Sequence, residues 1–334
     1  MFKRTILAFL ASCFLWASAA AAEDISFFRI GTGGVTGTYY PIGGLIAGII
    51  SNPPGARACE DGGSCGVPGL IATAQSSNGS VANVEAVASG ELDSGFAQSD
   101  IAYWAYSGTG RYEGKPAIDN LRAITSLYPE SIHLVVRRGA GIETIADLEG
   151  KRVSLDEDGS GTLVDARIIL EAFGMKDEDL DVRYIKPNFA IAEMREDRLD
   201  AFILIAGYPA GAVTELADSE TIDLLPIHGP EIETLLERHE FFAKDVIPSG
   251  VYQGIEETET LSVGAQWIIA DDADDDLVYG LTRALWHDSA RALLDHGHAK
   301  GRAITKDTAL DGIAIPLHPG AERYYRETGI LKGS

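Results

Sequence analysis

The chain has 334 residues, 46% of them hydrophobic, and a formal net charge of −23 at pH 7. This length exceeds that of one ordinary domain and predicts two, with ample apolar residues for their cores. The negative charge argues against nucleic acid and anionic lipid as partners, which require a cationic face, but not against an anionic ligand, which responds to local donors.

Residues 1–22 have the three-part layout of a cleaved secretory signal. Lys3 and Arg4 give a positive start, residues 5–16 form an apolar run, and small residues fill positions 17–22. The apolar run is too short for a permanent membrane anchor. We predict export to the periplasm with cleavage between Ala22 and Glu23, which removes Lys3 and Arg4 and takes the formal charge to −25.

Residues 10–13 (LASC) also have the form of a lipid-attachment box, so lipidation of Cys13 stays open as an alternative. No comparably long apolar segment follows residue 22. We therefore expect no direct insertion of the mature chain into a membrane, and any membrane role must come through a partner.

Short β-branched runs then alternate with helical patterns, which is typical of layered α/β folds with mostly parallel sheets. The first expected elements are strand 27–30, helix 39–50, strand 70–73, a helix ending at residue 89, strand 94–96 and helix 100–106. Two further strand-like runs, 121–127 and 132–137, lie where one domain should lead into the next.

The pattern restarts after residue 150. The expected elements are strand 152–155, helix 163–173, strand 182–185, helix 190–195, strand 201–205, helix 210–217, strand 224–227, helix 232–239, strand 263–270 and one long helix over 275–296. A second α/β unit is thus inserted in the first. We expect a discontinuous lobe I (23–130 plus 249–334) and an inserted lobe II (131–248), joined by two crossings that form a hinge beside a cleft.

Removal of the signal leaves Cys59 and Cys65, which bracket the short polar stretch 60–64 (EDGGS). In an oxidising compartment this spacing predicts a disulfide. A metal site is weakly supported there, because no His or further Cys lies nearby in the sequence.

Five loops share one layout, in which a strand is followed by small or polar residues and then a helix start. They are residues 33–39, 75–79, 98–100, 159–162 and 206–209. Such loops gather at the carboxyl ends of the strands, where ligands bind. Each helix start offers unpaired N–H groups and a partial positive charge, so several aimed at one point can hold a carboxylate without an Arg.

Nucleotide binding is poorly supported. Gly31, Gly33 and Gly37 do not have the G-x-G-x-x-G spacing, the acidic residue expected on a second strand is missing, and so is the phosphate-loop Lys.

The catalytic motifs that we considered are absent or incomplete. There is no G-x-S-x-G elbow, and His239-Glu240 lacks the second His of a zinc protease. His287, His296 and His298 suggest solvated surface residues rather than a metal site. We expect no catalytic residues, no cofactor and no bound metal.

Two acidic runs, 156–158 and 271–276, lack the spacing of a calcium loop and suggest solvated turns, although the first adjoins Gly159 in a proposed ligand loop. Tyr39 and Tyr208 are the best aromatic ligand candidates, since a Tyr offers both a ring wall and a hydroxyl. Core packing is the alternative for both.

The chain resembles the TAXI family of solute receptors of tripartite ATP-independent periplasmic (TRAP) transporters. The matching stretches are residues 30–41 (IGTGGVTGTYYP), 95–100 (GFAQSD), 126–130 (SLYPE), 147–153 (DLEGKRV), 159–162 (GSGT), 206–209 (AGYP) and 315–320 (IPLHPG). The resemblance implies a type II periplasmic-binding-protein fold, two α/β lobes around a hinged ligand cleft, and delivery of a small carboxylate, such as a glutamate-like amino acid or dicarboxylate, to a TRAP membrane permease.

By the same resemblance, nine residues should line the cleft of a monomeric receptor: Gly37, Thr38, Tyr39, Ser76, Gln98, Ser99, Ser160, Thr162 and Tyr208. One departure concerns Asp156, Glu157 and Asp158, which stand where many members have smaller, less charged residues. Three acids there could repel a second carboxylate or attract a ligand ammonium group, so the solute stays open.

The alternative from another functional class is an exported sensor module, which would present the same solute to a membrane signalling receptor.

Overall fold

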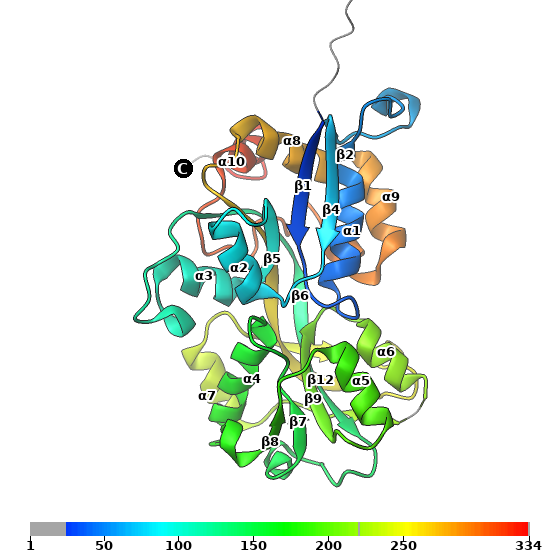
Figure 1. The fold of residues 1–334 in the computed structure, drawn as a ribbon, viewed down its shortest axis with the longest axis vertical. Coiled ribbons are helices and arrows are strands. Elements are labelled where there is room, and N and C mark those ends of the chain that lie inside the picture. Colours follow the sequence, from blue (N-terminus) through cyan, green and yellow to red (C-terminus); the bar gives the residue numbers. More distant parts are fainter. Residues whose placement is uncertain (1–24, 220, 333–334) are drawn as a thin grey trace, which may run out of the picture.

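The computed structural model describes residues 25–219 and 221–332. The predicted signal peptide, its cleavage site and Cys13 lie outside the described residues. The chain forms two α/β halves stacked along its long axis (Figure 1). The first half contains β1 (Ser26–Gly31), α1 (Tyr39–Ile50), β2 (Ser51–Asn52), β3 (Val67–Pro68), β4 (Leu70–Gln75), α2 (Ser80–Ala88), β5 (Ser94–Gln98), α3 (Ser99–Ser107), α8 (Asp275–Leu285), α9 (Asp288–Gly297) and α10 (Pro319–Glu327).

The second half contains β7 (Arg152–Ser154), α4 (Gly161–Ala172), β8 (Asp181–Arg183), α5 (Pro187–Arg195), β9 (Ala201–Ala206), α6 (Gly211–Ala217), β10 (Ile222–Leu224), α7 (Pro230–Arg238) and β11 (Ala243–Ile247). Two long strands, β6 (Leu121–Arg137) and β12 (Thr258–Ala270), belong to both halves. Short 3₁₀ turns lie at Cys59–Asp61, Gly110–Tyr112, Ile145–Leu148, Asp177–Asp179 and Ala299–Ala303.

A continuous sheet runs through both halves in the order β4-β1-β5-β12-β6-β9-β7-β8. In the first half, β1 is parallel to β4 and β5. In the second half, β7 is parallel to β8 and β9. Between these groups β6 and β12 pair antiparallel, so the chain passes twice between the halves along adjacent strands.

Local sequence explains the elements beside the cleft. In α1 the buried Ile42, Ile46, Ile49 and Ile50 recur at helical spacing and pack on the sheet, while Pro41 stands in the first turn, where a missing N–H costs nothing. All six residues of β9 are buried, as expected of an apolar strand covered on both faces.

The hydrophobic cores divide at the two crossing strands. On β6, Tyr128 packs in the first half and Ile132 in the second. On β12, Val263 packs in the second half and Ala265 in the first. Pro129 and Gly264, which face each other in the β6–β12 register, mark this division. The lobe boundaries at residues 130 and 248 stay predictions. The core contacts of Val263 and Ala265 favour a place near Gly264 for the return of the chain to the first half.

Three predicted elements are corrected by the structure. Residues 121–127 and 132–137 belong to one strand, β6, because β12 pairs with it through Pro129 and Ser131. The single helix predicted over 275–296 is two helices, α8 and α9. His287 breaks it with an extended backbone, and its ring Nδ1 accepts a hydrogen bond from the Ser289 N–H at 3.2 Å.

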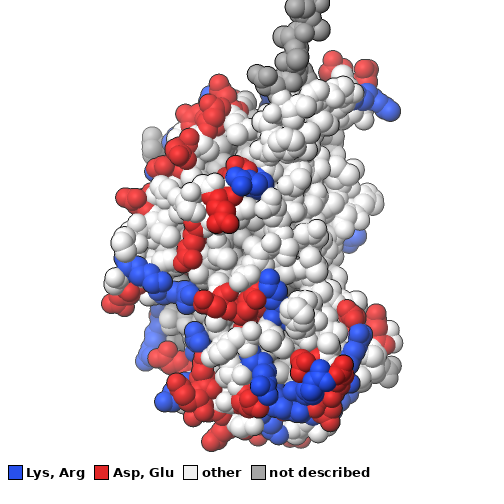
Figure 2. Space-filling model, in the orientation of Figure 1, with Lys and Arg blue, Asp and Glu red and all other residues white. Residues whose placement is uncertain are grey.

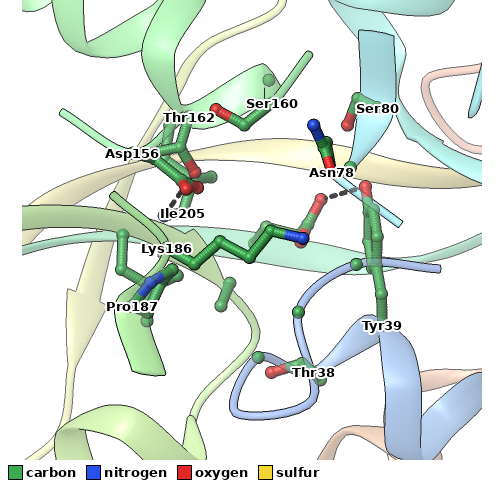
Figure 3. A pocket seen from close by; sticks show the side chains of 18 of the residues that line it. Thr38, Tyr39, Asn78, Ser80, Asp156, Ser160, Thr162, Lys186, Pro187 and Ile205 are labelled. Carbon is green, nitrogen blue, oxygen red and sulfur yellow. Dashed lines mark hydrogen bonds between the residues drawn. The ribbon is translucent and has the colours of Figure 1, made fainter. Parts of the chain in front are cut away.

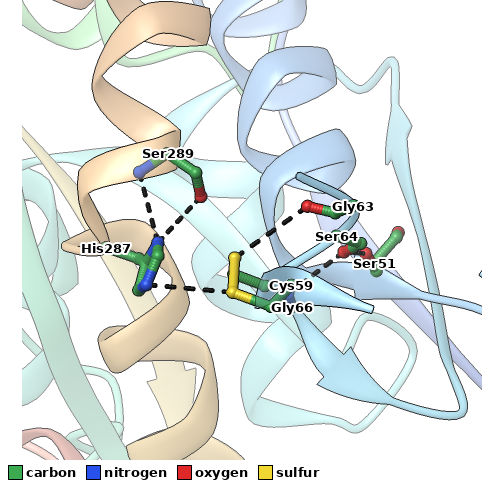
Figure 4. Close-up of a disulfide and its surroundings, with 8 residues drawn as sticks. Ser51, Cys59, Gly63, Ser64, Gly66, His287 and Ser289 are labelled. Atoms are coloured by element: carbon green, nitrogen blue, oxygen red, sulfur yellow. Dashed lines mark hydrogen bonds between the residues drawn. A yellow bond between two sulfur atoms is a disulfide. The ribbon is translucent and has the colours of Figure 1, made fainter. Parts of the chain in front are cut away.

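The predicted disulfide between Cys59 and Cys65 is confirmed (Figure 4). His287 Nε2 lies 3.9 Å from Cys59 Sγ. The two sulfur atoms are bonded to each other, so neither offers the thiolate that a metal ion would require.

Basic side chains are interspersed with acidic ones on the face shown in Figure 2 and do not form one patch. Several are paired: Arg152, for example, lies 2.6 Å from Asp200. Within the described residues, no helix is both long enough and apolar enough to cross a membrane.

Trp267 is fully buried on β12, and its indole N–H donates to Ser94 Oγ at 2.9 Å. We predict that Trp267→Ala lowers the free energy of unfolding by about 3–5 kcal/mol, because it leaves a cavity and an unpaired hydroxyl. Phe27→Ala is the matched control, since Phe27 is 72% exposed and the change should stay within about 0.5 kcal/mol. Urea unfolding followed by fluorescence and circular dichroism measures both, and equal losses would contradict the assigned core.

Candidate ligand-binding cleft

A cavity of about 60 Å³ lies between the two halves (Figure 3). Its lining comes from segments that follow the carboxyl ends of strands on both sides, as expected for an open α/β sheet. The first half supplies Gly33, Gly34, Gly37, Thr38, Tyr39, Ser77, Asn78, Gly79, Ser80 and Gln98. The second half supplies Asp156, Glu157, Ser160, Gly161, Thr162, Lys186, Pro187, Leu204, Ile205 and Ala206, and Glu130 enters from β6.

Four helices begin at this cavity. Tyr39 starts α1, Ser80 starts α2, Gly161 starts α4 and Pro187 starts α5. Each N-terminus contributes a partial positive charge of roughly half a unit and backbone N–H donors. Because two of these helices belong to each half, an anion between them would interact with both halves at once.

The halves are in direct contact across the cavity. The Thr36 carbonyl accepts from the Ala212 N–H at 3.0 Å, and the Thr38 hydroxyl donates to the Gly207 carbonyl. The Ala82 N–H donates to the Gly159 carbonyl, also at 3.0 Å. These bonds join loops of the first half to loops of the second, so the structure has the closed arrangement.

Three carboxyl groups line the cavity, and their surroundings differ. Glu130 accepts a hydrogen bond from the Tyr39 hydroxyl at 2.6 Å, and burial raises its pKa to about 8. Burial likewise raises the pKa of Asp156 to about 7. Glu157 instead forms an ion pair with Lys186 at 2.9 Å. Near neutral pH, Glu130 is therefore largely protonated and Asp156 partly so, which weakens their repulsion of an anion.

Lys186 is the only Lys or Arg among the described residues that line the cavity. It precedes α5 and extends from the second half toward Tyr39 (Figure 3). A Lys ammonium group offers three donors, so Lys186 can pair with Glu157 and still reach a solute oxygen.

Asp158, the last residue of the acidic run 156–158, lies outside the cavity that Asp156 and Glu157 line. The Asp158 side chain is 92% exposed, forms an ion pair with Arg111 of the first half at 3.3 Å and does not line the cavity. Its carbonyl accepts from the Asn78 side-chain amide at 3.0 Å. Asp158 therefore belongs to the contacts between the halves.

The structure brings six of the nine predicted site residues together. Those six are Gly37, Thr38, Tyr39, Gln98, Ser160 and Thr162. Ser160 also caps α4, where its hydroxyl accepts from the Leu163 N–H at 3.0 Å.

The other three lie outside this cavity. Ser76 donates to the Gly33 carbonyl at 3.0 Å and so supports the glycine loop. Ser99 is buried and lines a separate hollow beside Gly264. The Tyr208 ring lies under Lys300, whose Nζ is 3.7 Å from the ring centroid.

Glu130, Asp156, Glu157 and Lys186 line the cavity without having been predicted as site residues. The sequence carried a signal for each of them. Asp156 and Glu157 adjoin Gly159 in a proposed ligand loop, although a solvated turn was expected there; the burial of Asp156 corrects that expectation. Glu130 ends one of the stretches that resemble the receptor family, and Lys186-Pro187 is a helix start after a predicted strand.

A model of the NMT1-like family matches residues 30–329 of this chain. Among solved structures, PhnD1 from Prochlorococcus marinus (MIT 9301) in complex with methylphosphonate is similar, with a TM-score of 0.51, 11% identity, and coverage of 91% of this chain and 99% of that one. A protein of Bordetella bronchiseptica RB50 also has a TM-score of 0.51, with 16% identity and coverage of 91% and 82%. The predicted type II periplasmic-binding-protein fold with two lobes is confirmed.

Tyr39 supports the ionised form of Glu130, because a donor to a carboxylate favours its charge. We predict that Tyr39→Phe raises the Glu130 pKa from about 8 by roughly one unit, since a hydrogen bond to a charged group is worth about 1.5–3 kcal/mol. Carboxyl ¹³C NMR titration measures this shift. Tyr40→Phe is the matched control, because the Tyr40 side chain does not line the cavity; an unchanged Glu130 pKa in Tyr39→Phe would contradict the assigned pairing.

Proposed function

Because this chain belongs to the NMT1-like family, we propose that it is an exported receptor that captures a small anionic solute between its two halves. It releases this solute to a membrane transporter and performs no chemistry on it. The observation that carries the proposal is the convergence of four helix N-termini and Lys186, drawn from both halves, on one cavity.

The two halves are the moving lobes. In the open form the donors of the first half, around Thr38 and Ser80, lie apart from those of the second half, around Ser160 and Lys186. A solute that contacts both sets favours the closed form, because it interacts with all of them only there. The chain acts as a monomer in the periplasm, and Pro129 and Gly264 on the crossing strands mark its hinge.

A small carboxylate is the solute class that fits best. The closed cavity of about 60 Å³ has about four times the volume that holds one water molecule, so it favours a compact solute. A carboxylate suits the α1 and α4 N-termini, while Glu130 and Asp156 can accept from a ligand ammonium group in an amino acid. Methylphosphonate, the ligand of PhnD1, is the competing compact anion.

The transporter is a TRAP permease of the TAXI type. This finer assignment rests on the seven stretches between residues 30 and 320 that resemble TAXI receptors. Uptake by proteoliposomes that contain such a permease should require the purified receptor. A receptor that binds the solute but signals to a histidine kinase would leave uptake unchanged.

A thermal-shift screen tests the solute class. We predict that L-glutamate or succinate, in large excess over its dissociation constant, raises the melting temperature by about 5–10 °C, because binding to the folded form alone adds about 3–4 kcal/mol. Methylphosphonate and methanesulfonate test the competing anions. The diamine putrescine is the control of opposite charge: stabilisation by putrescine with no response to any anion would contradict the proposal.

Lys186 should matter for affinity more than for folding. For the anion that responds in the screen, we predict that Lys186→Gln weakens binding about 10- to 100-fold by calorimetry, the loss expected for one charge-assisted hydrogen bond. Lys176→Gln is the matched control, since Lys176 is 72% exposed and outside the cavity. Equal affinities in the two variants would remove Lys186 from the site.

A further inference from the structure

Two carboxyl groups from opposite halves meet behind the cavity. Asp100 lies in the first turn of α3 in the first half, and Asp165 lies on α4 in the second half. Both are 0% exposed, and each carboxyl group perturbs the pKa of the other, which places the two close together. Two buried carboxylates side by side would repel each other strongly, so the pair favours a shared proton.

The hydrogen bonds of the pair show where that proton belongs. Asp165 Oδ2 accepts from the Gln98 side-chain amide at 2.7 Å, and Asp100 Oδ1 accepts from the Ile101 N–H at 2.8 Å. The remaining oxygens, Asp165 Oδ1 and Asp100 Oδ2, are buried and have no donor. A proton shared between the two carboxyl groups supplies the donor that these oxygens lack.

The neighbouring charged groups do not replace this proton. Within the described residues, neither Asp100 nor Asp165 forms an ion pair with a basic side chain. Glu130, on β6, raises the pKa of Asp165 further when it is ionised, and the positive charge of Lys300 lowers the pKa of Glu130. Burial raises the pKa of Asp165 well above its usual range, and the charge of Asp100 raises it further; burial also raises the pKa of Asp100.

We propose that closure of the two halves takes up one proton, which Asp100 and Asp165 share, so that the closed form becomes more favourable as the pH falls. In the open form the two groups lie apart in water, and each ionises near its ordinary value of about 4. The closed form holds the proton to higher pH. The stabilisation of the closed form is therefore complete below the open-state value and is lost as the pH rises through the closed-state value.

The pair is also connected to the ligand cavity. The Ser80 hydroxyl donates to Gln98 Oε1 at 3.1 Å, and Gln98 donates in turn to Asp165. Ser80 and Gln98 line the cavity, so a solute that holds Gln98 in this orientation also positions the donor to Asp165. Proton uptake and solute capture thus favour the same closed arrangement.

The experiment needs no ligand. Spin labels on cysteines introduced at residues 115 and 176, one in each half and both exposed, report the distance between the halves by pulsed EPR in the mature chain with its disulfide intact. Across pH 5–9 we expect the closed-to-open ratio to rise as the pH falls, by up to tenfold per pH unit for each proton taken up. An interlobe distance that is independent of pH would overturn the proposal.

Isosteric variants measure how much of the pH dependence of closure comes from Asp100 and Asp165. Asp165→Asn keeps both hydrogen bonds without a proton, because its amide can donate to Asp100 and its carbonyl can accept from Gln98. Asp100→Asn does the same from the other side and serves where Asp165→Asn folds poorly. Each variant should make the closed-to-open ratio depend on pH as if about one proton fewer were taken up, which is a reduction of up to tenfold per pH unit.

Three further variants serve as controls for other titrating groups. Glu130→Gln and Asp156→Asn remove the two cavity carboxyls whose pKa values lie near neutral, and the contribution of the pair should persist in both. Asp276→Asn changes a carboxylate on α8 whose side chain is 84% exposed and should leave the slope as it is. A wild-type slope in both Asp100→Asn and Asp165→Asn would show that the pair is only structural and would overturn the proposal.

Discussion

Two adjacent antiparallel strands, β6 and β12, set the geometry on which the cleft depends. They carry the chain between the halves at one place, where Pro129 faces Gly264. Because the sheet continues through this crossing, the carboxyl ends of β1, β4 and β5 face those of β7, β8 and β9 across a narrow gap. The loops after those strands then meet without a further connection, and the helices that follow them begin at one cavity.

The cavity has a less negative electrostatic environment than the charge of the whole chain would indicate. The formal charge of −23 is spread over the surface, whereas the cavity combines four helix N-termini with Lys186. The carboxyl groups inside it are either paired, as Glu157 is with Lys186, or have their pKa raised by burial, as Glu130 and Asp156 do. Protonation and pairing thus lower the negative charge that faces the solute.

Much of this arrangement was predictable from sequence. Strand–loop–helix patterns located the loops that contain Thr38, Gln98 and Ser160, because a helix start has a local signature, and the family resemblance implied that these residues line the cleft. Residues whose role depends on the opposite half were not predictable in this way. Asp165 looks like an ordinary helical acid until folding brings it to Asp100.

Local sequence patterns gave wrong predictions where contacts with distant parts of the chain decide the structure. The runs 121–127 and 132–137 suggested two strands, yet β12 pairs with β6 through Pro129 between them. The apolar periodicity over residues 275–296 continued past His287, although its extended backbone starts a new helix there. Tyr208 followed the expected loop layout, but its ring packs against Lys300 instead of lining the cavity.

We propose that an anion bound between the halves holds them closed. Small-angle X-ray scattering of the mature protein, with and without a saturating anion that raises its melting temperature, tests this claim most directly. We expect a smaller radius of gyration in the bound state and a bound-state profile that matches the closed structure. Identical profiles at saturation, with binding confirmed by calorimetry in the same buffer, would contradict it.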